Sequence, residues 1–215
     1  MKCTGMGAAF GAALLASLAS GAEAQVRTVS SEYDEGYIAY GRGDYAAALR
    51  YWRGEAERGN AAAQHNLSLL YDRGDGVPQN FEESIKWTKA AAEQGNHAAQ
   101  LRFGMAFADG RGVKRDPVEA VKWFQRSAEY GNAQAQYNMG AVYEYGRGAK
   151  RDLVAAHMWY NLAAANFTIG WDRADAFVSR DRVAALLTQE QLADAQKRAQ
   201  DWKPVQPPQQ AQQVQ

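Results

Sequence analysis

The chain has 215 residues, and its 24 lysines and arginines are balanced by 24 aspartates and glutamates. Balanced charge argues against nucleic acid and against an anionic membrane surface as general binding partners, because proteins that bind these surfaces carry an excess of basic side chains. The single cysteine, Cys3, excludes an internal disulfide and a cysteine-based metal site.

Residues 1–24 have the features of a signal peptide. Lys2 gives a positive start, residues 6–19 are apolar and rich in alanine and leucine, and residues 22–24 (Ala-Glu-Ala) have the small-x-small pattern of a cleavage site. We therefore expect cleavage before Gln25. The apolar stretch is short for a membrane span and no later segment reaches the required length, so no integral membrane segment is expected after cleavage. An uncleaved N-terminal anchor is the alternative.

Three stretches of the chain repeat with a period of 36 residues. Such a period is typical of a solenoid, in which supersecondary units stack and each unit contacts only its neighbours. The equivalent positions are Gly59-Asn60, Gly95-Asn96 and Gly131-Asn132; Gln64, Gln100 and Gln136; and the glycine pairs Gly74/Gly76, Gly110/Gly112 and Gly146/Gly148.

The segment 116–149 shows the organisation of one repeat. Asp116 is suited to cap a helix, and Glu119 stands at the capping-box position three residues later. Apolar residues then recur at helical spacing until Gly131, where a glycine can end the helix and Asn132 can cap the next one. A second helix follows, as far as the glycine pair. Each repeat is thus predicted to consist of a helix, a short turn, a second helix and a glycine loop.

Large and small residues recur at fixed positions and predict how neighbouring helix pairs nest. In the first helix of each repeat, the large position is held by Tyr51, Trp87, Trp123 and Trp159, and the small position by Ala56, Ala92, Ala128 and Ala164. In the second helix, the core position is held by Leu67, Phe103 and Met139, the small position by Ser68, Gly104 and Gly140, and an aromatic position by Tyr71, Phe107 and Tyr143. Alanines and aromatic residues are therefore expected to dominate the core.

Both ends depart from the repeat, as the caps of a solenoid do. Residues 33–40 are expected to form a lone capping helix, and two further helices are expected at 172–187 and 189–202, with a capping box between Thr188 and Gln191. The predicted organisation is a signal peptide (1–24), an N-terminal linker and capping helix (25–43), three full repeats plus a fourth first helix (44–165), C-terminal capping helices (166–203) and a disordered tail rich in proline and glutamine (204–215).

At these positions the chain resembles the Sel1-like repeat family, a relative of tetratricopeptide-repeat proteins with longer units. The resemblance covers residues 44–165 and rests on the first-helix aromatic, the Ala-Ala before Gly-Asn, the Ala-x-x-x-(Leu/Met)-Gly-x-x-Tyr run and the Gly-x-Gly-Val loop. It implies an all-α solenoid of αα-hairpins stacked as a right-handed superhelix. It also implies adaptor roles, including those of bacterial envelope proteins that bind and restrain sensors. Cysteine-rich secreted relatives linked to β-lactam binding have disulfide-paired helices, which this chain lacks.

Few residues suggest chemistry of their own. The histidines His65, His97 and His157 stand at non-equivalent repeat positions and are better explained as isolated side chains than as metal ligands. The Gly-x-Gly pairs follow helices instead of strands, so they indicate turns and not a nucleotide-binding loop. Ser68 and Ser127 replace a glycine and an alanine at packing positions. We predict no catalytic residue, no metal site and no cofactor.

The solvent-facing side of the first helices is the candidate binding site. Arg50, Lys86 and Lys122 share one repeat position. Arg53 and Lys89 form a second basic row, each four residues before a glutamate. We expect the first helices to line a concave groove in which these rows contact an extended or helical partner segment. Ordinary surface charge with weak pairing inside each helix is the alternative. The aromatic anchors expected in or near the groove are Trp52, Phe124, Tyr130 and Tyr160.

The leading hypothesis is an exported, non-catalytic protein-binding module, an adaptor or regulator in the periplasm of a Gram-negative bacterium. Secretion is the alternative destination. The expected partner is a protein, such as an envelope sensor or a cell-wall complex, and self-association through the end repeats is a further alternative. The competing function is a hydrolase or binding protein for cell-wall or β-lactam substrates, which the absence of disulfides disfavours.

Overall fold

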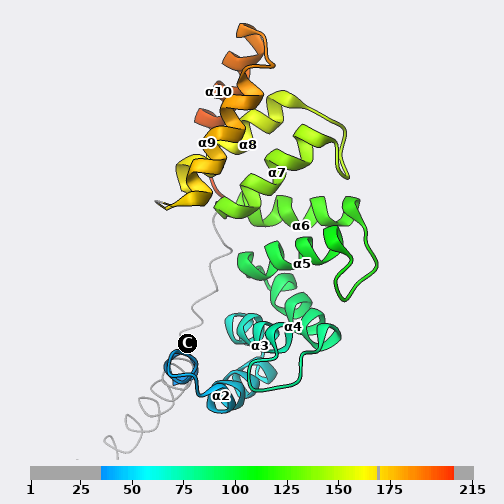
Figure 1. Cartoon of the computed structure of the whole chain (residues 1–215), viewed down its shortest axis with the longest axis vertical. Coiled ribbons are helices and arrows are strands. Elements are labelled where there is room, and N and C mark those ends of the chain that lie inside the picture. The colour runs from blue at the N-terminus through cyan, green and yellow to red at the C-terminus, as the bar shows by residue number, and fades with distance from the viewer. Residues whose placement is uncertain (1–34, 169, 206–215) are drawn as a thin grey trace, which may run out of the picture.

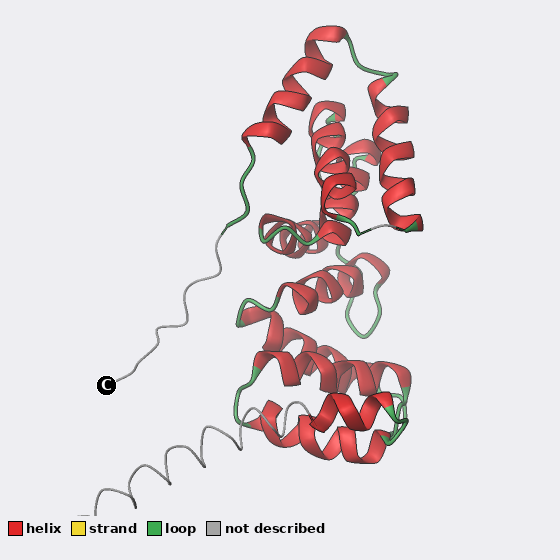
Figure 2. Cartoon of the chain, turned by 90° about the vertical axis from the view of Figure 1, so that its left-hand side faces the viewer, coloured by secondary structure: helices red, strands yellow, loops and turns green. Residues whose placement is uncertain are grey.

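The computed structural model describes residues 35–168 and 170–205, so the predicted signal peptide and residues 206–215 lie outside the described part of the chain. Every regular element in these two ranges is a helix (Figure 2). A short helix at residues 35–41 precedes a stack of longer ones, which follow an arc (Figure 1). These are α2 (Tyr45–Glu57), α3 (Ala61–Arg73), α4 (Phe81–Glu93), α5 (His97–Asp109), α6 (Pro117–Glu129), α7 (Ala133–Tyr145), α8 (Leu153–Asn166), α9 (Trp171–Ala184) and α10 (Gln189–Asp201).

The helices of the repeats begin at the predicted caps. The carboxylate of Asp116 accepts hydrogen bonds of 3.0 Å from the backbone N–H groups of Val118 and Glu119, and so occupies two donors that the helix itself leaves unpaired. Glu119 does not complete a capping box, because its carboxylate pairs instead with Lys122 at 2.7 Å. The predicted box between α9 and α10 is complete. Caps of the same kind are formed by Asp44, Asn60, Asn80, Asn96, Asn132 and Asp152.

The glycine pairs are turns, as predicted, and they also pack against the first helix of their own repeat. The first glycine of each pair ends a second helix in the left-handed conformation, as Gly110 does with φ of 76°. The second glycine approaches the first helix of the same repeat: a Cβ on Gly112 would lie 2.9 Å from the carbonyl oxygen of Phe81, and a Cβ on Gly148 would overlap the carbonyl of Pro117. A side chain at these positions would push the loop away from that helix.

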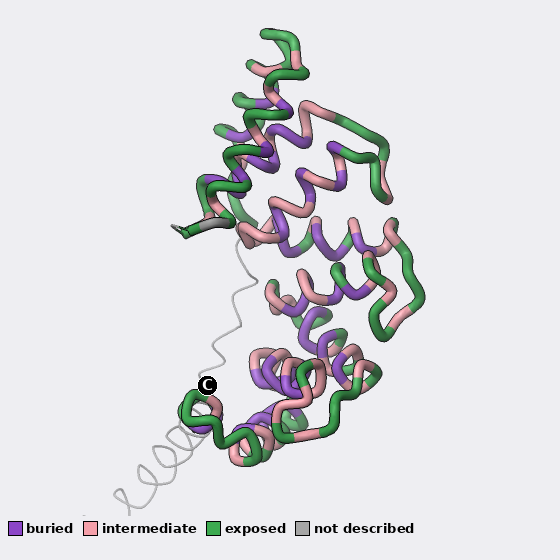
Figure 3. The backbone as a smooth tube through the Cα atoms, in the orientation of Figure 1, coloured by how far each residue is buried: buried purple, intermediate pink, exposed green. Residues whose placement is uncertain are grey.

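Consecutive repeats are joined by a large residue of a first helix that packs on a small residue of the preceding second helix. A Cβ on Gly104 would lie only 2.6 Å from the ring of Phe124, so the missing side chain is what admits the ring. Buried residues follow the facing sides of the stacked helices, while the glycine loops are exposed (Figure 3). The equivalent positions hold Gly140 with Tyr160, while the first two repeats have buried Ser68 and the smaller Thr88 there.

Three of the aromatic residues predicted to anchor a partner belong to this buried interface instead. Trp52, Phe124 and Tyr160 are 3%, 5% and 1% exposed. Their sequence neighbours Trp123 and Trp159 are buried as well, at the predicted core position. A first helix such as α6 packs against α5 on one side and α7 on the other, so its buried arc is wider than the single apolar stripe that the prediction assumed. The prediction that these three side chains contact a partner is therefore wrong.

The C-terminal helices close the stack over α8. Glu144 of α7 is buried and accepts hydrogen bonds from Arg182 of α9, at 3.0 Å from Nε and 2.8 Å from Nη2, and from the Tyr160 hydroxyl at 2.8 Å. Burial alone would raise the pKa of Glu144, but the hydrogen bonds from Arg182 and Tyr160 lower it below its ordinary value. The carboxylate is therefore ionised and holds α9 against α7 and α8.

The chain continues in a defined path beyond α10. The ring of Trp202 meets that of Trp159 edge to face, with 6.5 Å between their centroids, and the backbone N–H of Val205 donates to the carbonyl oxygen of Glu129 at 2.8 Å. Val205, predicted to belong to a disordered tail, is thus held at the C-terminal end of α6. In the described part of the chain, no helix has both the length and the apolar character that a bilayer span requires.

Candidate functional site

One side of α2 forms an open hollow of about 350 Å³. The hollow is deepened by Gly54, since nothing lies within 4 Å of the place that a Cβ would occupy there. The hollow is lined by Ala46, Leu49, Arg50, Arg53, Gly54 and Glu57. We call these six residues, together with the residues 36 and 72 positions later in α4 and α6, the first-helix face.

The predicted basic rows lie on this face and are exposed. The side chains of Lys86 and Lys122 are 64% and 62% exposed. Each pairs with the glutamate three residues earlier, Lys86 with Glu83 at 3.2 Å and Lys122 with Glu119 at 2.7 Å, and the hydrogen bond to Glu119 raises the pKa of Lys122. Exposed pairs of this kind contribute only a few tenths of a kcal/mol, so a partner carboxylate can replace the glutamate at little cost.

The other three basic residues, Lys89, Arg50 and Arg53, each contact a different kind of partner. Lys89 lies 3.7 Å from Glu93 in the same helix, as the four-residue spacing predicted. The Arg50 guanidinium lies 5.2 Å from the centroid of the Tyr51 ring. Arg53 donates a 2.7 Å hydrogen bond to the hydroxyl of Tyr71 in α3. The structure thus places the five predicted basic residues along three successive first helices, while the positions of the partner and its contacts remain predictions.

The equivalent face of α8 is covered by α10. Leu162 stands where α2 has Gly54; it is 7% exposed and belongs to the same buried cluster as Ala199 of α10. His157 and Asn161, which stand where α2 has Leu49 and Arg53, line a cavity of about 580 Å³ together with α10 residues. Among the described residues, one first-helix face therefore has a helix docked on it, and the other three have none.

Tyr130, the fourth predicted anchor, lies at the end of α6 and is half-buried. It lines an open groove of about 360 Å³ between the C-terminal ends of α4 and α6, beside Glu129 of the first-helix face. Val205 also lines this groove, so the segment after α10 reaches into it. We call it the turn groove, because the Gly95 turn forms part of its wall.

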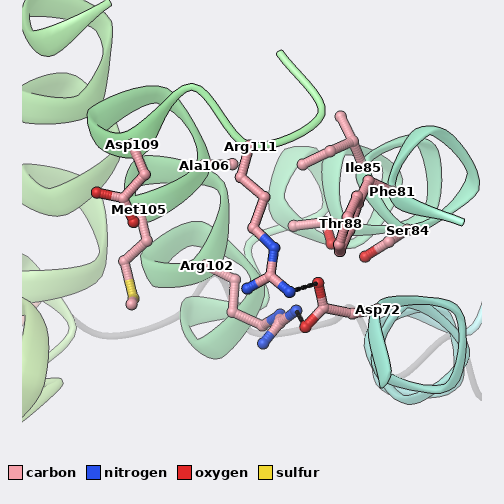
Figure 4. A pocket seen from close by; sticks show the side chains of 10 residues that line it. All are labelled: Asp72, Phe81, Ser84, Ile85, Thr88, Arg102, Met105, Ala106, Asp109 and Arg111. Atoms are coloured by element: carbon pink, nitrogen blue, oxygen red, sulfur yellow. Dashed lines mark ion pairs between the residues drawn. The ribbon is translucent and has the colours of Figure 1, made fainter. Parts of the chain in front are cut away.

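A different pocket lies between the first two repeats and is closed by an ion-pair cluster (Figure 4). Asp72 of α3 accepts from Arg102 of α5 at 3.1 Å and from Arg111 of the following glycine loop at 3.2 Å. The Arg111 guanidinium also lies 4.5 Å from the centroid of the Phe81 ring. The remaining space is about 70 Å³, so this cluster joins the two repeats and leaves little room for a ligand.

The same pocket one repeat later is more open. Ala108 and Asn138 stand where the first pocket has Asp72 and Arg102, so the ion-pair cluster is absent and the space grows to about 300 Å³. Arg147 still lines it, at the position of Arg111. We call it the loop pocket. It is the main rival to the first-helix face as a binding surface.

Burial and hydrogen bonds between helices define the environments of His65, His157 and Ser127. Burial, followed by the charge of Arg102, lowers the pKa of His65 to about 4. Burial also lowers the pKa of His157. Ser127 donates a 2.7 Å hydrogen bond to the carbonyl of His97, which ties α6 to α5. Within residues 35–168 and 170–205, no three His, Cys, Asp or Glu side chains gather in a way that would hold a metal ion.

The three glutamines in register have a structural role that the repeat pattern alone did not indicate. Gln64, Gln100 and Gln136 are buried, and each donates from Nε2 to the carbonyl of the alanine eight residues earlier, at 3.1 to 3.2 Å. This bond links the second helix to the end of the first helix across the short turn between them. A polar residue repeated within an otherwise alanine-rich interior was the signal that would have revealed it, because a buried amide needs partners.

The model of the Sel1 repeat family matches residues 61–96, 97–132 and 133–166. A crystal structure of a Sel1 repeat protein from Oxalobacter formigenes is similar, with 27% identity and a TM-score of 0.67 over 78% of this chain and 68% of that one. A protective antigen of uropathogenic Escherichia coli strains with an SLR fold is similar at 29% identity and a TM-score of 0.51, over 81% of this chain and 45% of that one. Among curated proteins, none matches the sequence.

Proposed function

Because the chain belongs to the Sel1 repeat family, whose helical modules typically bind proteins, we propose that it is a non-catalytic adaptor that docks a partner segment on the first-helix face of α2, α4 and α6. The observation that carries this proposal is the helix α10 lying on the equivalent face of α8. The chain itself thus supplies an example of what such a face accommodates.

The α10 contact indicates the chemistry of the partner. Ala195 and Ala199 are 0% and 8% exposed, so α10 approaches with its small residues inward. On the open faces the half-buried row Leu49, Ile85 and Val121 offers apolar contact beside the basic rows. A partner helix with a stripe of small or apolar residues, flanked by aspartate or glutamate, complements both features.

We propose the bacterial envelope as the place of action. The signal-peptide features of residues 1–24 and the resemblance to envelope adaptors support export to the periplasm, with secretion as the alternative. A partner there would be an envelope sensor or a cell-wall complex, which the module would restrain or join by equilibrium docking.

The proposal is tested by reversing two charges of the first-helix face. Proteins captured from envelope extract by wild type are identified, and the affinity of each purified candidate is measured for wild type and for the Lys86→Glu/Lys122→Glu variant. A loss of affinity of about tenfold or more is expected, since one factor of ten corresponds to about 1.4 kcal/mol.

The matched control is Lys114→Glu/Lys197→Glu, which changes the net charge equally at exposed positions outside the face. This control should retain full affinity. Equal affinity of both variants for every captured protein would remove the first-helix face from the function, and turnover of a chromogenic β-lactam or of peptidoglycan by wild type would overturn the non-catalytic proposal.

A further inference from the structure

One position near the end of each second helix carries a carboxylate in two of its three copies. Asp72, Ala108 and Glu144 are equivalent, since they stand 36 residues apart. Both carboxylates are paired with arginine: Asp72 with Arg102 and Arg111 (Figure 4), and Glu144 with an arginine of α9. In α5 the alanine leaves this place without a carboxylate, and the loop pocket opens there.

The loop pocket keeps an arginine that the neighbouring pocket pairs with its aspartate. Arg147 lines the loop pocket at the position of Arg111, and it is exposed. Its guanidinium lies 5.1 Å from the centroid of the Tyr145 ring, but it makes no ion pair within residues 35–168 and 170–205. The partner that Asp72 supplies to Arg111 is therefore missing for Arg147.

A second guanidinium is fixed beside the same place. Arg115 donates from Nε to the backbone carbonyl of Ala108 at 3.0 Å, whereas the equivalent bond to the carbonyl of Asp72 comes from the neutral side chain of Gln79. Asp109 is the one acidic residue of the lining. The loop pocket thus has two arginines and one aspartate, while the pocket between the first two repeats has two of each. Positive charge is in excess where the carboxylate is absent.

Most of the remaining lining is apolar. Ala120, Phe124 and Val142 are 2%, 5% and 6% exposed and form the buried side of the pocket, and Met105 is 44% exposed beside them. The volume of about 300 Å³ is at the lower end of the range for small-molecule sites. One turn of a partner helix, about 10 Å wide and 5.4 Å long, is larger than this space. The pocket is therefore suited to a small molecule.

We propose that the loop pocket binds a small organic carboxylate with an apolar body. The carboxylate takes the place that the side chains of Asp72 and Glu144 fill in the other copies and accepts charge-assisted hydrogen bonds from Arg147 and Arg115. The apolar body lies against Phe124 and Val142, so one ligand satisfies both features of the lining. This site goes beyond the proposed function, because the loop pocket shares no residue with the first-helix face.

The test is a titration of the purified, ¹⁵N-labelled protein with 3-phenylpropionate, followed through its backbone amide shifts. Saturable shifts are expected at Ala108, Val142 and Arg147, with a dissociation constant of about 1 mM for a ligand with so few atoms. Two probes separate the two parts of the ligand: 3-phenylpropanamide lacks the charge, and acetate lacks the ring. Each should bind about tenfold more weakly, or weaker still.

Two variants remove the site in different ways. Arg147→Gln takes away the guanidinium at an exposed position, and Ala108→Asp supplies the carboxylate that Asp72 supplies in α3, so the pocket should close on itself. Each should lower the affinity for 3-phenylpropionate by about tenfold or more. Arg147→Gln decides the question alone if Ala108→Asp fails to fold.

The matched control is Arg111→Gln, the same substitution at the same repeat position in the pocket that has its own carboxylate. This variant should bind 3-phenylpropionate as wild type does. The proposal is overturned by an absence of saturable shifts in wild type, by equal affinity for the amide, or by an unchanged affinity of Arg147→Gln. An equal loss of affinity in Arg111→Gln would also overturn it, because binding would then not be specific to the loop pocket.

Discussion

The faces of α6 and α8 occupy the same place in the repeat but meet different surroundings. In α8 the face carries buried Leu162 and His157 and lies under α10, whereas in α6 the equivalents of these residues are exposed Arg126 and half-buried Val121. The backbone is the same, so the side chains decide whether the face is closed within the protein or left open. A solenoid needs a cap only at its ends, and the charged inner repeats are therefore free to bind something else.

The largest expected effect comes from giving α8 the side chain that α6 has. Leu162→Arg places a charge under α10, where it has no partner, and should lower the free energy of unfolding by about 3 kcal/mol. It should also release α10, since Leu162 and Ala199 share one buried cluster. Denaturant unfolding measures the first effect, and trypsin cleavage at Lys197 and Arg198 the second.

The reciprocal change is its control. Arg126→Leu alters an exposed position on α6 and should change the free energy of unfolding by no more than about 0.5 kcal/mol. If both substitutions had the same small effect on the free energy of unfolding, the docking of α10 would not depend on the α8 face. The proposed difference between the faces of α6 and α8 would then be wrong.

An intermediate effect is expected at the glycine that admits Tyr160. In Gly140→Ala the new Cβ would lie 2.5 Å from the Tyr160 ring, so the variant should lose about 1–3 kcal/mol of unfolding free energy through overpacking. Gly54→Ala is the matched change on the open face of α2, where nothing lies near the Cβ position, and it should gain about 0.5–1 kcal/mol because alanine favours the helix. Thermal unfolding should show opposite shifts; shifts of one sign would contradict the packing described.

The smallest effect is a dependence of the free energy of unfolding on pH, which arises from His157 on the α8 face. Burial, and then the charge of Arg180, lower the pKa of His157, while Asp181 opposes them. The unfolded chain therefore binds a proton at this residue at a higher pH than the folded chain does, so its contribution to stability is present above about pH 6.5 and is lost as the pH falls below that value.

His157→Val, which installs the residue of α6, should flatten the decline of unfolding free energy between pH 7 and 5. His65, whose pKa is lowered to about 4, is present in both proteins, so its own contribution cancels in the comparison. An unchanged slope would show that His157 does not titrate on unfolding.

Much of the fold could be predicted because its determinants are local. The caps Asp116 and Asn132 and the glycine loops act on neighbouring backbone, and the 36-residue period repeats the Asp116 position four times and the other two three times. The repeated small residues of the second helices, such as Gly104, were also visible in the sequence, but the ring that packs on Gly104 is that of Phe124 and not that of Trp123, the predicted large residue.

The failures arose where contacts are not local. Trp52, Phe124 and Tyr160 were predicted to contact a partner but are buried, because a single stripe cannot represent a helix that packs on both sides. Asp72 and Glu144 stand at the same repeat position, but their partners Arg102 and Arg182 do not, so the period does not reveal these ion pairs. For the basic rows the sequence predicts exposure, which the structure confirms, but the partner follows from neither.

The most direct test of the central claim is site-specific photocrosslinking in living cells. A photoreactive phenylalanine analogue is placed at position 86 or 122 on the first-helix face, and at position 105 or 147 beside the loop pocket, and the crosslinked peptides are identified by mass spectrometry. The account predicts that one partner protein crosslinks from positions 86 and 122, through a helix with small and acidic residues, and does not crosslink from 105 or 147. Crosslinks from positions 105 and 147 alone would contradict this prediction and move the binding surface to the loop pocket.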